Sequence, residues 1–181
     1  MTEISTNPVT EIIENNIIKD LAENYEVSED GKTWIFKIRE DVKFSDGQKL
    51  TAKDVAFTFN KTKEIGTTFD FKLLEKAEAL DDKTVKFTFS APCSTFIYNA
   101  ANLGIVAEHA YKDTNTYSLN PIGSGPYKVV SYTQGQQLIL DRNEEYYGTK
   151  PKFKRLTLVT MTPDTALASI KAGDIDIVNV S

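Results

Sequence analysis

Large apolar residues alternate with polar ones along much of the first half of the chain. Between Thr33 and Ile38 every second residue is large and apolar, and this period of two is typical of a β-strand with one buried face. The preceding segment SEDGK, residues 28–32, has the composition of a turn, which predicts a hairpin over residues 25–38. Two further hairpins are predicted: VTEII with IIKDLA around Asn15 and Asn16, and residues 77–89, whose second strand carries Val85, Phe87 and Phe89.

The period of the apolar residues changes at Thr51. Thr51 is suited to cap a helix, and Asp54 stands three residues later, where a carboxylate meets the free N–H groups of the first turn. Val55 and Phe59 then recur at helical spacing, so a helix of about three turns is predicted. A second, short helix is predicted for STFIYNAAN, residues 94–102.

The second half of the chain predicts further strands and one more helix. Extended segments are predicted at residues 104–111, 127–132, 137–142 and 155–161. The helix begins near Pro163 and is closed by Gly173, the residue type that most easily adopts the left-handed conformation after a last turn. A strand at residues 174–180 would complete a strand–helix–strand unit with a parallel pair and a right-handed crossover. The whole pattern predicts a mixed α/β fold of the α+β kind, in which antiparallel hairpins precede the start of an α/β sheet.

Composition narrows the class of protein. At 181 residues, 40% of them hydrophobic, the chain is able to bury a substantial core. We expect no nucleic-acid partner, because the net charge is −5 and the 21 Lys and Arg residues are scattered. No apolar run approaches membrane-spanning length. The first ten residues lack the features of a secretion signal, which leaves either a cytoplasmic protein or one whose signal is not in this sequence.

Residue types that carry catalysis are sparse. His109 is the only histidine, so it cannot build a multi-histidine metal site, and a triad with Ser94 or Ser124 would lack a nucleophile elbow. Cys93, the single cysteine, is better explained as a small half-buried residue. The segment GSG, residues 123–125, lacks the lysine and the following helix of a phosphate loop. We therefore expect no catalytic residue, no metal site and no cofactor.

Four segments, taken in order, carry a family resemblance. They are LAENYEVSEDGKTWIFKIREDVKFSDGQKLTAKDVAFTF (residues 21–59), DDKTVKFTFSAP (81–92), NPIGSGPYKV (120–129) and LDRNEEYYGTKPKFKRLTLVTMTPDTALASIKAGDIDIV (140–178). Together they resemble the extracellular solute-binding proteins of the oligopeptide, dipeptide and nickel class, which serve ABC importers. Each motif alone is weak, but four in the correct order and spacing make accident a poor explanation.

The resemblance implies a fold and a place for the ligand. The fold would be periplasmic-binding-protein-like, type II, of the peptide-binding class, with this chain corresponding to roughly the first third. Residues 4–106 would form the small extra lobe, and residues 107–181 would begin the main lobe. The helix-to-strand junction YNAANLG would form one wall of the cleft, and a variable loop would reach toward the ligand. The candidate ligand contacts are Phe69, Asn99, Asn102, Leu103 and Gly104. Asn102 and Gly104 are explained equally well as the end of a helix.

The resemblance also implies a function. The protein would be an extracytoplasmic, non-catalytic component, periplasmic or a cell-surface lipoprotein, that binds a peptide or another small molecule between two lobes and delivers it to the membrane permease of an ABC importer. Nickel is disfavoured because the junction offers no cation to hold an anionic metal chelate. A surface adhesion or interaction module, a small hydrolase and a transcriptional sensor remain open as alternatives. We also expect this chain to self-associate through its second half, where strand edges are predicted to lie uncovered.

Overall fold

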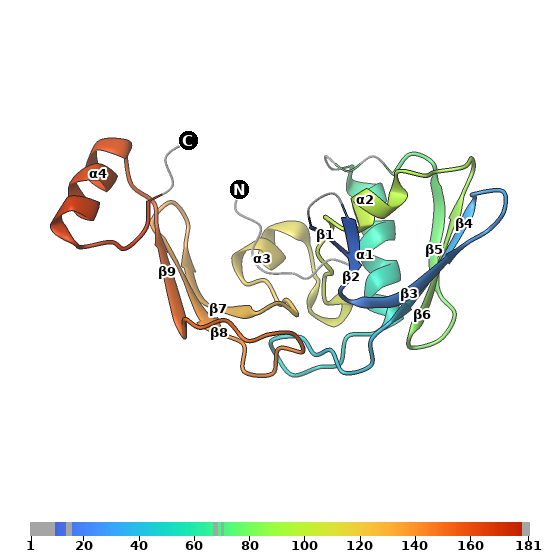
Figure 1. Ribbon diagram of the computed structural model, residues 1–181, viewed down its shortest axis with the longest axis horizontal. Coiled ribbons are helices and arrows are strands. Elements are labelled where there is room, and N and C mark those ends of the chain that lie inside the picture. The colour runs from blue at the N-terminus through green and yellow to red at the C-terminus, as the bar shows by residue number, and fades with distance from the viewer. Residues whose placement is uncertain (1–9, 14–15, 67–68, 70, 179–181) are drawn as a thin grey trace.

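The computed structural model describes residues 10–13, 16–66, 69 and 71–178 (Figure 1). The described strands form three antiparallel sheets, and the helices lie beside or between them. The first half contains β1 (Thr10–Ile13), β2 (Asn16–Lys19), β3 (Ala22–Val27), β4 (Thr33–Ile38), α1 (Ala52–Ile65), β5 (Leu74–Ala79), β6 (Thr84–Phe89) and α2 (Phe96–Ala100). The second half contains the 3-10 helix η1 (Glu108–Ala110), α3 (Thr114–Leu119), β7 (Tyr127–Thr133), β8 (Gln137–Arg142), β9 (Arg155–Val159) and α4 (Pro163–Ala172).

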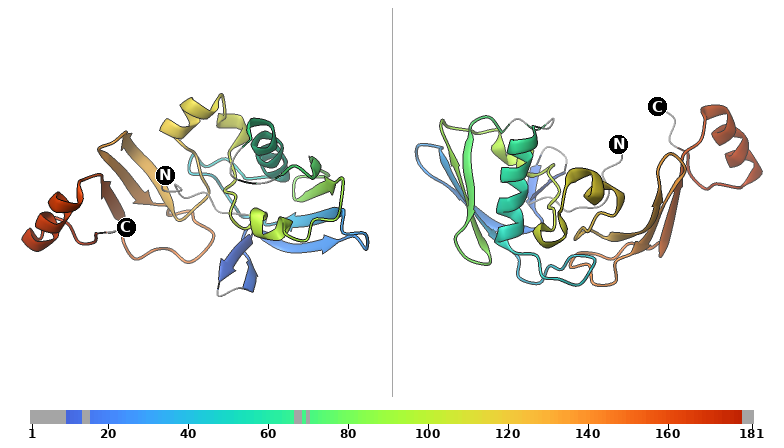
Figure 2. Two further views of the ribbon diagram at one scale, coloured as in Figure 1. Left: turned by 90° about the horizontal axis from the view of Figure 1, so that it is seen from above. Right: turned by 180° about the vertical axis from the view of Figure 1, so that it is seen from behind.

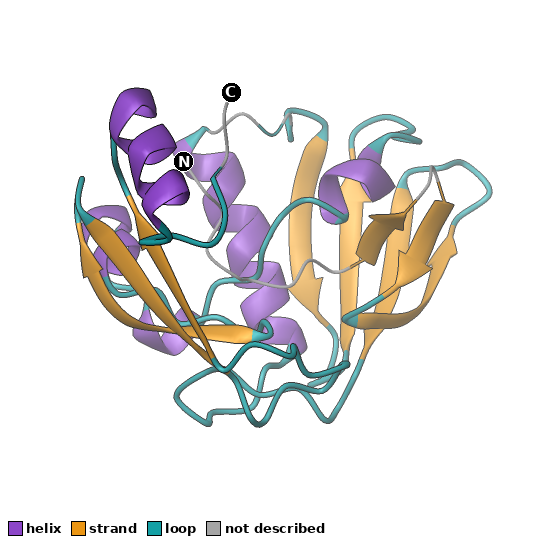
Figure 3. Ribbon diagram, turned by 60° about the vertical axis from the view of Figure 1, so that its left-hand side comes forward, coloured by secondary structure: helices purple, strands orange, loops and turns teal. Residues whose placement is uncertain are grey.

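The four-stranded sheet carries the hydrophobic core. Its strand order is β3-β4-β6-β5, and its register places Trp34 opposite Phe87 and Phe36 opposite Val85. These four side chains are buried, because the period of two turns them all to one face and α1 and α2 cover that face (Figure 3). The three hairpins predicted from the alternation are confirmed.

Helix α1 begins where the change of period predicts. Asp54 Oδ2 accepts hydrogen bonds from the backbone N–H of Thr51 at 2.9 Å and from its hydroxyl at 3.0 Å, which fixes the first turn. Leu50 and Val55, on either side of this cap, are both buried and close the turn from the apolar side. The helix ends at Gly66, whose φ of 64° lies in the left-handed region that favours glycine.

The second half forms a smaller sheet at the other end of an elongated molecule. Its order is β7-β8-β9, with an irregularity in the register between Val129 and Ser131. Leu138 and Leu140 of the central strand are 8% and 7% exposed, so one face of this sheet is also covered. Figure 2 shows the four-stranded sheet and the sheet β7-β8-β9 on opposite sides of α3, with α4 beyond the sheet β7-β8-β9.

Two local predictions in the second half are corrected. Residues 104–111 were expected to be extended, but residues 108–110 form η1. Helix α3 was not predicted, because six mostly polar residues are too short to show helical periodicity. Its signal is Asp113, whose carboxylate accepts a hydrogen bond from the N–H of Thr116 at 2.9 Å and caps the helix.

The predicted last strand, residues 174–180, is wrong for its described part. Residues 174–178 form bends and no strand, while residues 179–180 lie outside the described residues. A parallel crossover requires its helix to pack back on the sheet, whereas α4 buries only Ala166. The helix itself is confirmed: Pro163 stands in its first turn, and Gly173 closes it with a φ of 81°.

Candidate functional site

Helix α2 and the segment after it contain four of the five predicted ligand contacts. Asn99 and Gly104 are half-buried, Asn102 is exposed, and Leu103 is 9% exposed with its side chain in the core. The side-chain amide of Asn102 donates to the carbonyl oxygen of Tyr98 at 2.7 Å. This amide therefore satisfies a carbonyl group of the last turn of α2, whose C-cap residue is Ala101, and the amide oxygen of Asn102 has no hydrogen bond within the described part of the chain. Gly104 does not adopt a positive φ, so it is not a left-handed cap.

Aromatic residues lie beside α2. Phe69 stacks on Phe71 with ring centroids 6.0 Å apart, and Phe71 contacts Phe96 of α2 edge to face at 6.4 Å. This series of contacts places Phe69 on the α2 side of the sheet, together with the other predicted contacts. Tyr98 was missed from the sequence. It is 49% exposed on α2, and the signal that could have found it is an aromatic residue next to Asn99 in a helix whose apolar side is otherwise buried.

The position of α2 is fixed by Phe96. This side chain is fully buried and contacts six aromatic rings of the core, with centroids 4.7 to 6.4 Å apart. The rings belong to Trp34, Phe36, Phe59, Phe71, Phe87 and Phe89. The exposed surface of α2 is therefore presented by a rigid support.

The segment that leaves the site is held by polar groups of α1. The hydroxyl of Thr58 accepts a hydrogen bond from the N–H of Val106 at 3.0 Å, and Asp54 Oδ1 accepts one from the N–H of Glu108 at 3.0 Å. Thr58 and Asp54 are 2% and 6% exposed. Buried polar groups require partners, and these two find theirs in the backbone of a segment about fifty residues away in the chain. Residues 106–108 are thereby fixed against α1.

A second set of contacts joins the two halves of the chain. The Tyr147 hydroxyl donates to Asp20 at 2.8 Å, and the Arg39 guanidinium lies 5.1 Å from the centre of the Tyr147 ring. Arg39 also donates twice to Asp41, at 3.0 and 2.9 Å, and this carboxylate raises the pKa of the guanidinium. The residues that carry the family resemblance, on both sides of residue 106, therefore have a structural role at this junction.

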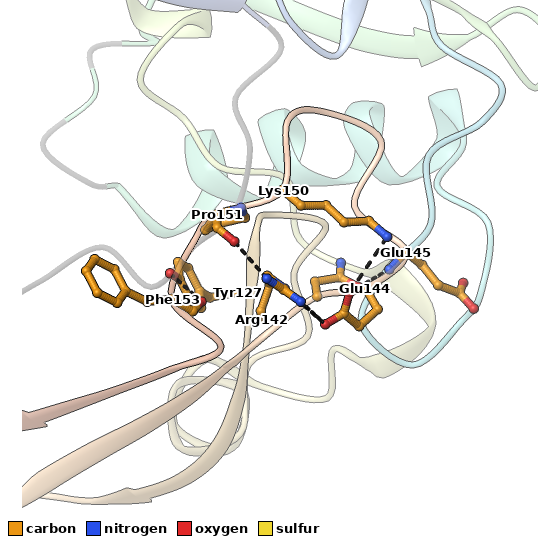
Figure 4. Close-up of polar contacts among 8 residues, drawn as sticks. Tyr127, Arg142, Glu144, Glu145, Lys150, Pro151 and Phe153 are labelled. Carbon is orange, nitrogen blue, oxygen red and sulfur yellow. Dashed lines mark hydrogen bonds and ion pairs between the residues drawn. The ribbon is translucent and has the colours of Figure 1, made fainter.

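The loop after β8 is another structural part of the resemblance (Figure 4). Arg142 donates two hydrogen bonds to Glu144 Oε1, at 3.0 and 2.7 Å, and one to the carbonyl oxygen of Pro151 at 3.0 Å. A Cβ at Gly148 would lie 2.7 Å from the ring of Tyr146, so a side chain there would require the ring to move. These contacts fold residues 142–151 back on themselves.

Residues suspected of catalysis are placed where they do not form a reactive group. His109 Nε2 lies 2.7 Å from Asp46 Oδ2, and both side chains are less than a third exposed. The Ser124 hydroxyl is fully buried and has no hydrogen-bond partner among the described residues. Cys93 is half-buried, and its sulfur lies 3.9 Å from the hydroxyl of Thr95. His109 and Cys93 are thus each placed beside a polar side chain, whereas the Ser124 hydroxyl is buried alone among the described residues.

Two hollows lie elsewhere on the described surface. One, of about 440 Å³, is lined by α1, β5 and Glu108, and the other, of about 170 Å³, lies between α1 and α3. Neither hollow is lined by a predicted ligand contact. Across the described ranges no group of three or more His, Cys, Asp or Glu side chains is arranged to hold a metal ion. Within the same ranges, no helix has the length and the apolar character that crossing a membrane requires.

Solved structures define the class of fold. The NikZ protein of Campylobacter jejuni, solved with Ni(L-His), matches with a TM-score of 0.88 and 30% identity over 96% of this chain and 37% of its own. The oligopeptide-binding protein AppA of Bacillus subtilis, solved with a nonapeptide, matches with a TM-score of 0.81 and 28% identity over 94% of this chain and 37% of its own. The fold is that of a type II periplasmic-binding-protein-like chain, as the resemblance implied.

The family follows from the sequence comparisons. Residues 16–181 match the model of the bacterial extracellular solute-binding proteins, family 5, and the chain belongs to that family. A probable D,D-dipeptide-binding periplasmic protein of Escherichia coli is 37% identical over 87% of this chain and 33% of its own length. The dipeptide-binding protein of the same organism is 29% identical over 86% of this chain and 34% of its own length. The chain thus spans about a third of the length of these relatives.

Proposed function

We propose that this chain contributes one wall of the ligand site in the substrate-binding component of an ABC importer. The observation that carries the proposal is the family match over residues 16–181. Helix α2, which Phe96 anchors in the core, adds an exposed face with neutral polar groups. One relative is named as a probable D,D-dipeptide-binding periplasmic protein and another as a dipeptide-binding protein. The protein would act outside the cytoplasm, without catalysis, and its partner in the membrane would be the permease of the importer.

The chemistry of the wall favours a peptide as ligand. Residues 90–107 contain no charged side chain, while Asn99, Asn102 and Tyr98 supply amide and phenol groups that both donate and accept hydrogen bonds. A peptide backbone offers the complementary donors and acceptors. An anionic metal chelate would require a cation, and this wall has none. Phe69, Asn99, Asn102, Leu103 and Gly104 are therefore proposed as the site, with Leu103 supporting it from below.

We propose that the boundary between the two lobes lies near residue 106. The buried core group that contains Phe96 runs from Leu21 to Ala107, which supports a small lobe of residues 4–106. Residues 107–181 would then begin the main lobe. The contacts of Tyr147 with Asp20 and Arg39 would hold the two parts together.

Saturation-transfer NMR with competing ligand classes tests the proposal. The chain is incubated separately with dipeptides, tripeptides, free amino acids and a nickel–histidine chelate. We expect transfer to the peptides alone and weak binding, because burial of a small ligand normally requires a closed site. An Asn99→Asp variant keeps the shape of the wall and adds a negative charge, so it should weaken the transfer to acidic peptides most. Equal transfer to the chelate, or none to any peptide, would overturn the proposal.

A further inference from the structure

The segment that joins α2 to η1 is extended and has one face in the core. Leu103, Ile105 and Ala107 are 9%, 0% and 0% exposed, whereas Gly104 and Val106 between them are half-buried. This period of two turns every second side chain inward, as in a strand. Residues 105–107 lie outside the described helices and strands, so their backbone N–H groups require partners of another kind.

Helix α1 supplies two of these partners. The Thr58 hydroxyl accepts a hydrogen bond from the N–H of Val106 at 3.0 Å, and Asp54 Oδ1 accepts one from the N–H of Glu108 at 3.0 Å. Four residues of a helix rise about 6 Å, and two residues of an extended chain span about 6.6 Å. The spacing of the two acceptors along α1 therefore matches the spacing of the two donors along the segment.

Helix α3 supplies the partner for the N–H between them. The N–H of Ala107 donates to the Tyr117 hydroxyl at 3.2 Å, and this hydroxyl donates to the carbonyl oxygen of Ile122. Burial raises the pKa of the Tyr117 phenol, which keeps the proton that the second bond requires. Three consecutive N–H groups are thus held by side chains from two helices, and we call these three side chains, Thr58, Asp54 and Tyr117, the clamp.

Three candidate ligand contacts, Asn102, Leu103 and Gly104, lie between two fixed points. Phe96 fixes α2 before them, and the clamp fixes residues 106–108 after them. A hydrogen bond weakens steeply as its distance and angle depart from the ideal, so groups that bind a ligand must be held in place. Gly104 is only two residues from the first clamped N–H, and its position depends on that bond more than on α2.

We propose that Thr58, Asp54 and Tyr117 are positioning residues of the ligand site, which hold Gly104 and the end of the wall in place without touching the ligand. The inference rests on the proposed function, because it concerns the same site. It depends only on contacts within the described residues, and each of these contacts joins the backbone of one segment to a side chain of a helix.

Thr58→Val is the informative variant, because it keeps the shape of the side chain and removes the acceptor of the Val106 N–H. Thr62→Val is the matched control. The Thr62 hydroxyl donates to the carbonyl of Thr58 at 2.8 Å, just as that of Thr58 donates to the carbonyl of Asp54 at 2.7 Å. Within the described part of the chain Thr62 makes no hydrogen bond with residues 106–108. Thr58→Ser restores the hydroxyl and should rescue the parent behaviour.

Amide exchange and ¹⁵N relaxation of the ligand-free chain test the clamp without any peptide. In Thr58→Val the Val106 amide should exchange about tenfold faster, and Gly104 should become more mobile, while Thr62→Val and Thr58→Ser keep the parent values. Tyr117→Phe should speed the exchange of the Ala107 amide by a similar factor, which keeps the test available if Thr58→Val does not fold. Unchanged exchange at the clamped amide, or unchanged mobility of Gly104, would overturn the inference.

Titration with L-alanyl-L-alanine, followed by the amide resonances, tests the effect on binding. Thr58→Val should bind several-fold more weakly than the parent, and Thr62→Val and Thr58→Ser should bind like the parent. Equal affinities for Thr58→Val and Thr62→Val would overturn the inference. Failure of the parent to bind this or any other peptide would overturn the proposed function instead, and the exchange and relaxation measurements would still decide whether the clamp holds Gly104.

Discussion

Replacement of Phe96 by alanine should destabilise the chain more than most single substitutions. The side chain is fully buried, and two of its six aromatic neighbours, Phe87 and Phe89, lie with ring centroids only 4.8 and 4.7 Å away. Truncation removes the ring and leaves a cavity among rigid partners that belong to two strands, β4 and β6, to α1 and to the loop before β5, so little collapse is available. Phe→Ala changes of this kind cost about 3–5 kcal/mol, and we expect about 4 kcal/mol here. A typical domain has about 5–15 kcal/mol in total, so much of the stability would be lost.

Urea unfolding monitored by tryptophan fluorescence measures this loss. Trp34 is the single tryptophan, is 6% exposed and lies 5.7 Å from the Phe96 ring, so its emission reports on this part of the core. Circular dichroism shows whether the variant remains folded without urea. Phe96→Leu, which fills most of the volume, should lose about 1 kcal/mol.

The matched control is Phe153→Ala, because Phe153 is 69% exposed. It should change the free energy of unfolding by about 0.5 kcal/mol or less. A loss below about 1 kcal/mol for Phe96→Ala would show that α2 is not anchored by this ring and would refute the description of a rigid wall.

Three further substitutions test other parts of the account. Asp54→Ala removes the acceptor for Thr51 and for the N–H of Glu108, and urea unfolding should show a loss of about 2 kcal/mol. The hydrogen bond from Arg155 holds the pKa of Asp141 below its ordinary value of 3.8, so this carboxylate stabilises the fold above that pH and ceases to do so as the pH falls through its lowered pKa. Asp141→Asn should therefore reduce the thermal midpoint at neutral pH and leave it unchanged in strong acid, whereas a constant difference across the pH range would contradict the assignment. Gly173→Ala places a Cβ at a φ of 81° and should cost about 1 kcal/mol, seen as a lower thermal midpoint, while an unchanged midpoint would mean that α4 tolerates the loss of its cap.

The sequence predicted those elements whose determinants are local. The alternation of Trp34 and Phe36, and the cap of Thr51 with Asp54, depend on neighbouring residues alone, and the structure shows both as predicted. Gly173 is a further case, because a left-handed residue after a helix requires nothing distant. The bounds of β8 and α4 were also predicted, because the residues that begin and end these elements are neighbours in the sequence.

Elements that depend on distant partners could not be predicted in this way. The segment around Val106 was expected to be extended, yet Glu108 is tied to Asp54 in α1 and η1 forms. The alternating residues after Gly173 suggested a strand, but strands require a neighbour, and none of the described strands pairs with residues 174–178. In the candidate site Tyr98 was missed, because its exposure follows from how Phe96 docks α2 on the sheet.

Mapping a bound peptide on the labelled chain tests the central claim most directly. The amide resonances of the protein are followed by two-dimensional NMR while a dipeptide is added. The account predicts shifts confined to the α2 wall, at Tyr98, Asn99, Asn102 and Gly104, with none at the hollow beside α1 and β5 around Asn60. Shifts centred on Asn60, or no shift at all with any peptide, would contradict the claim that α2 forms a wall of the ligand site.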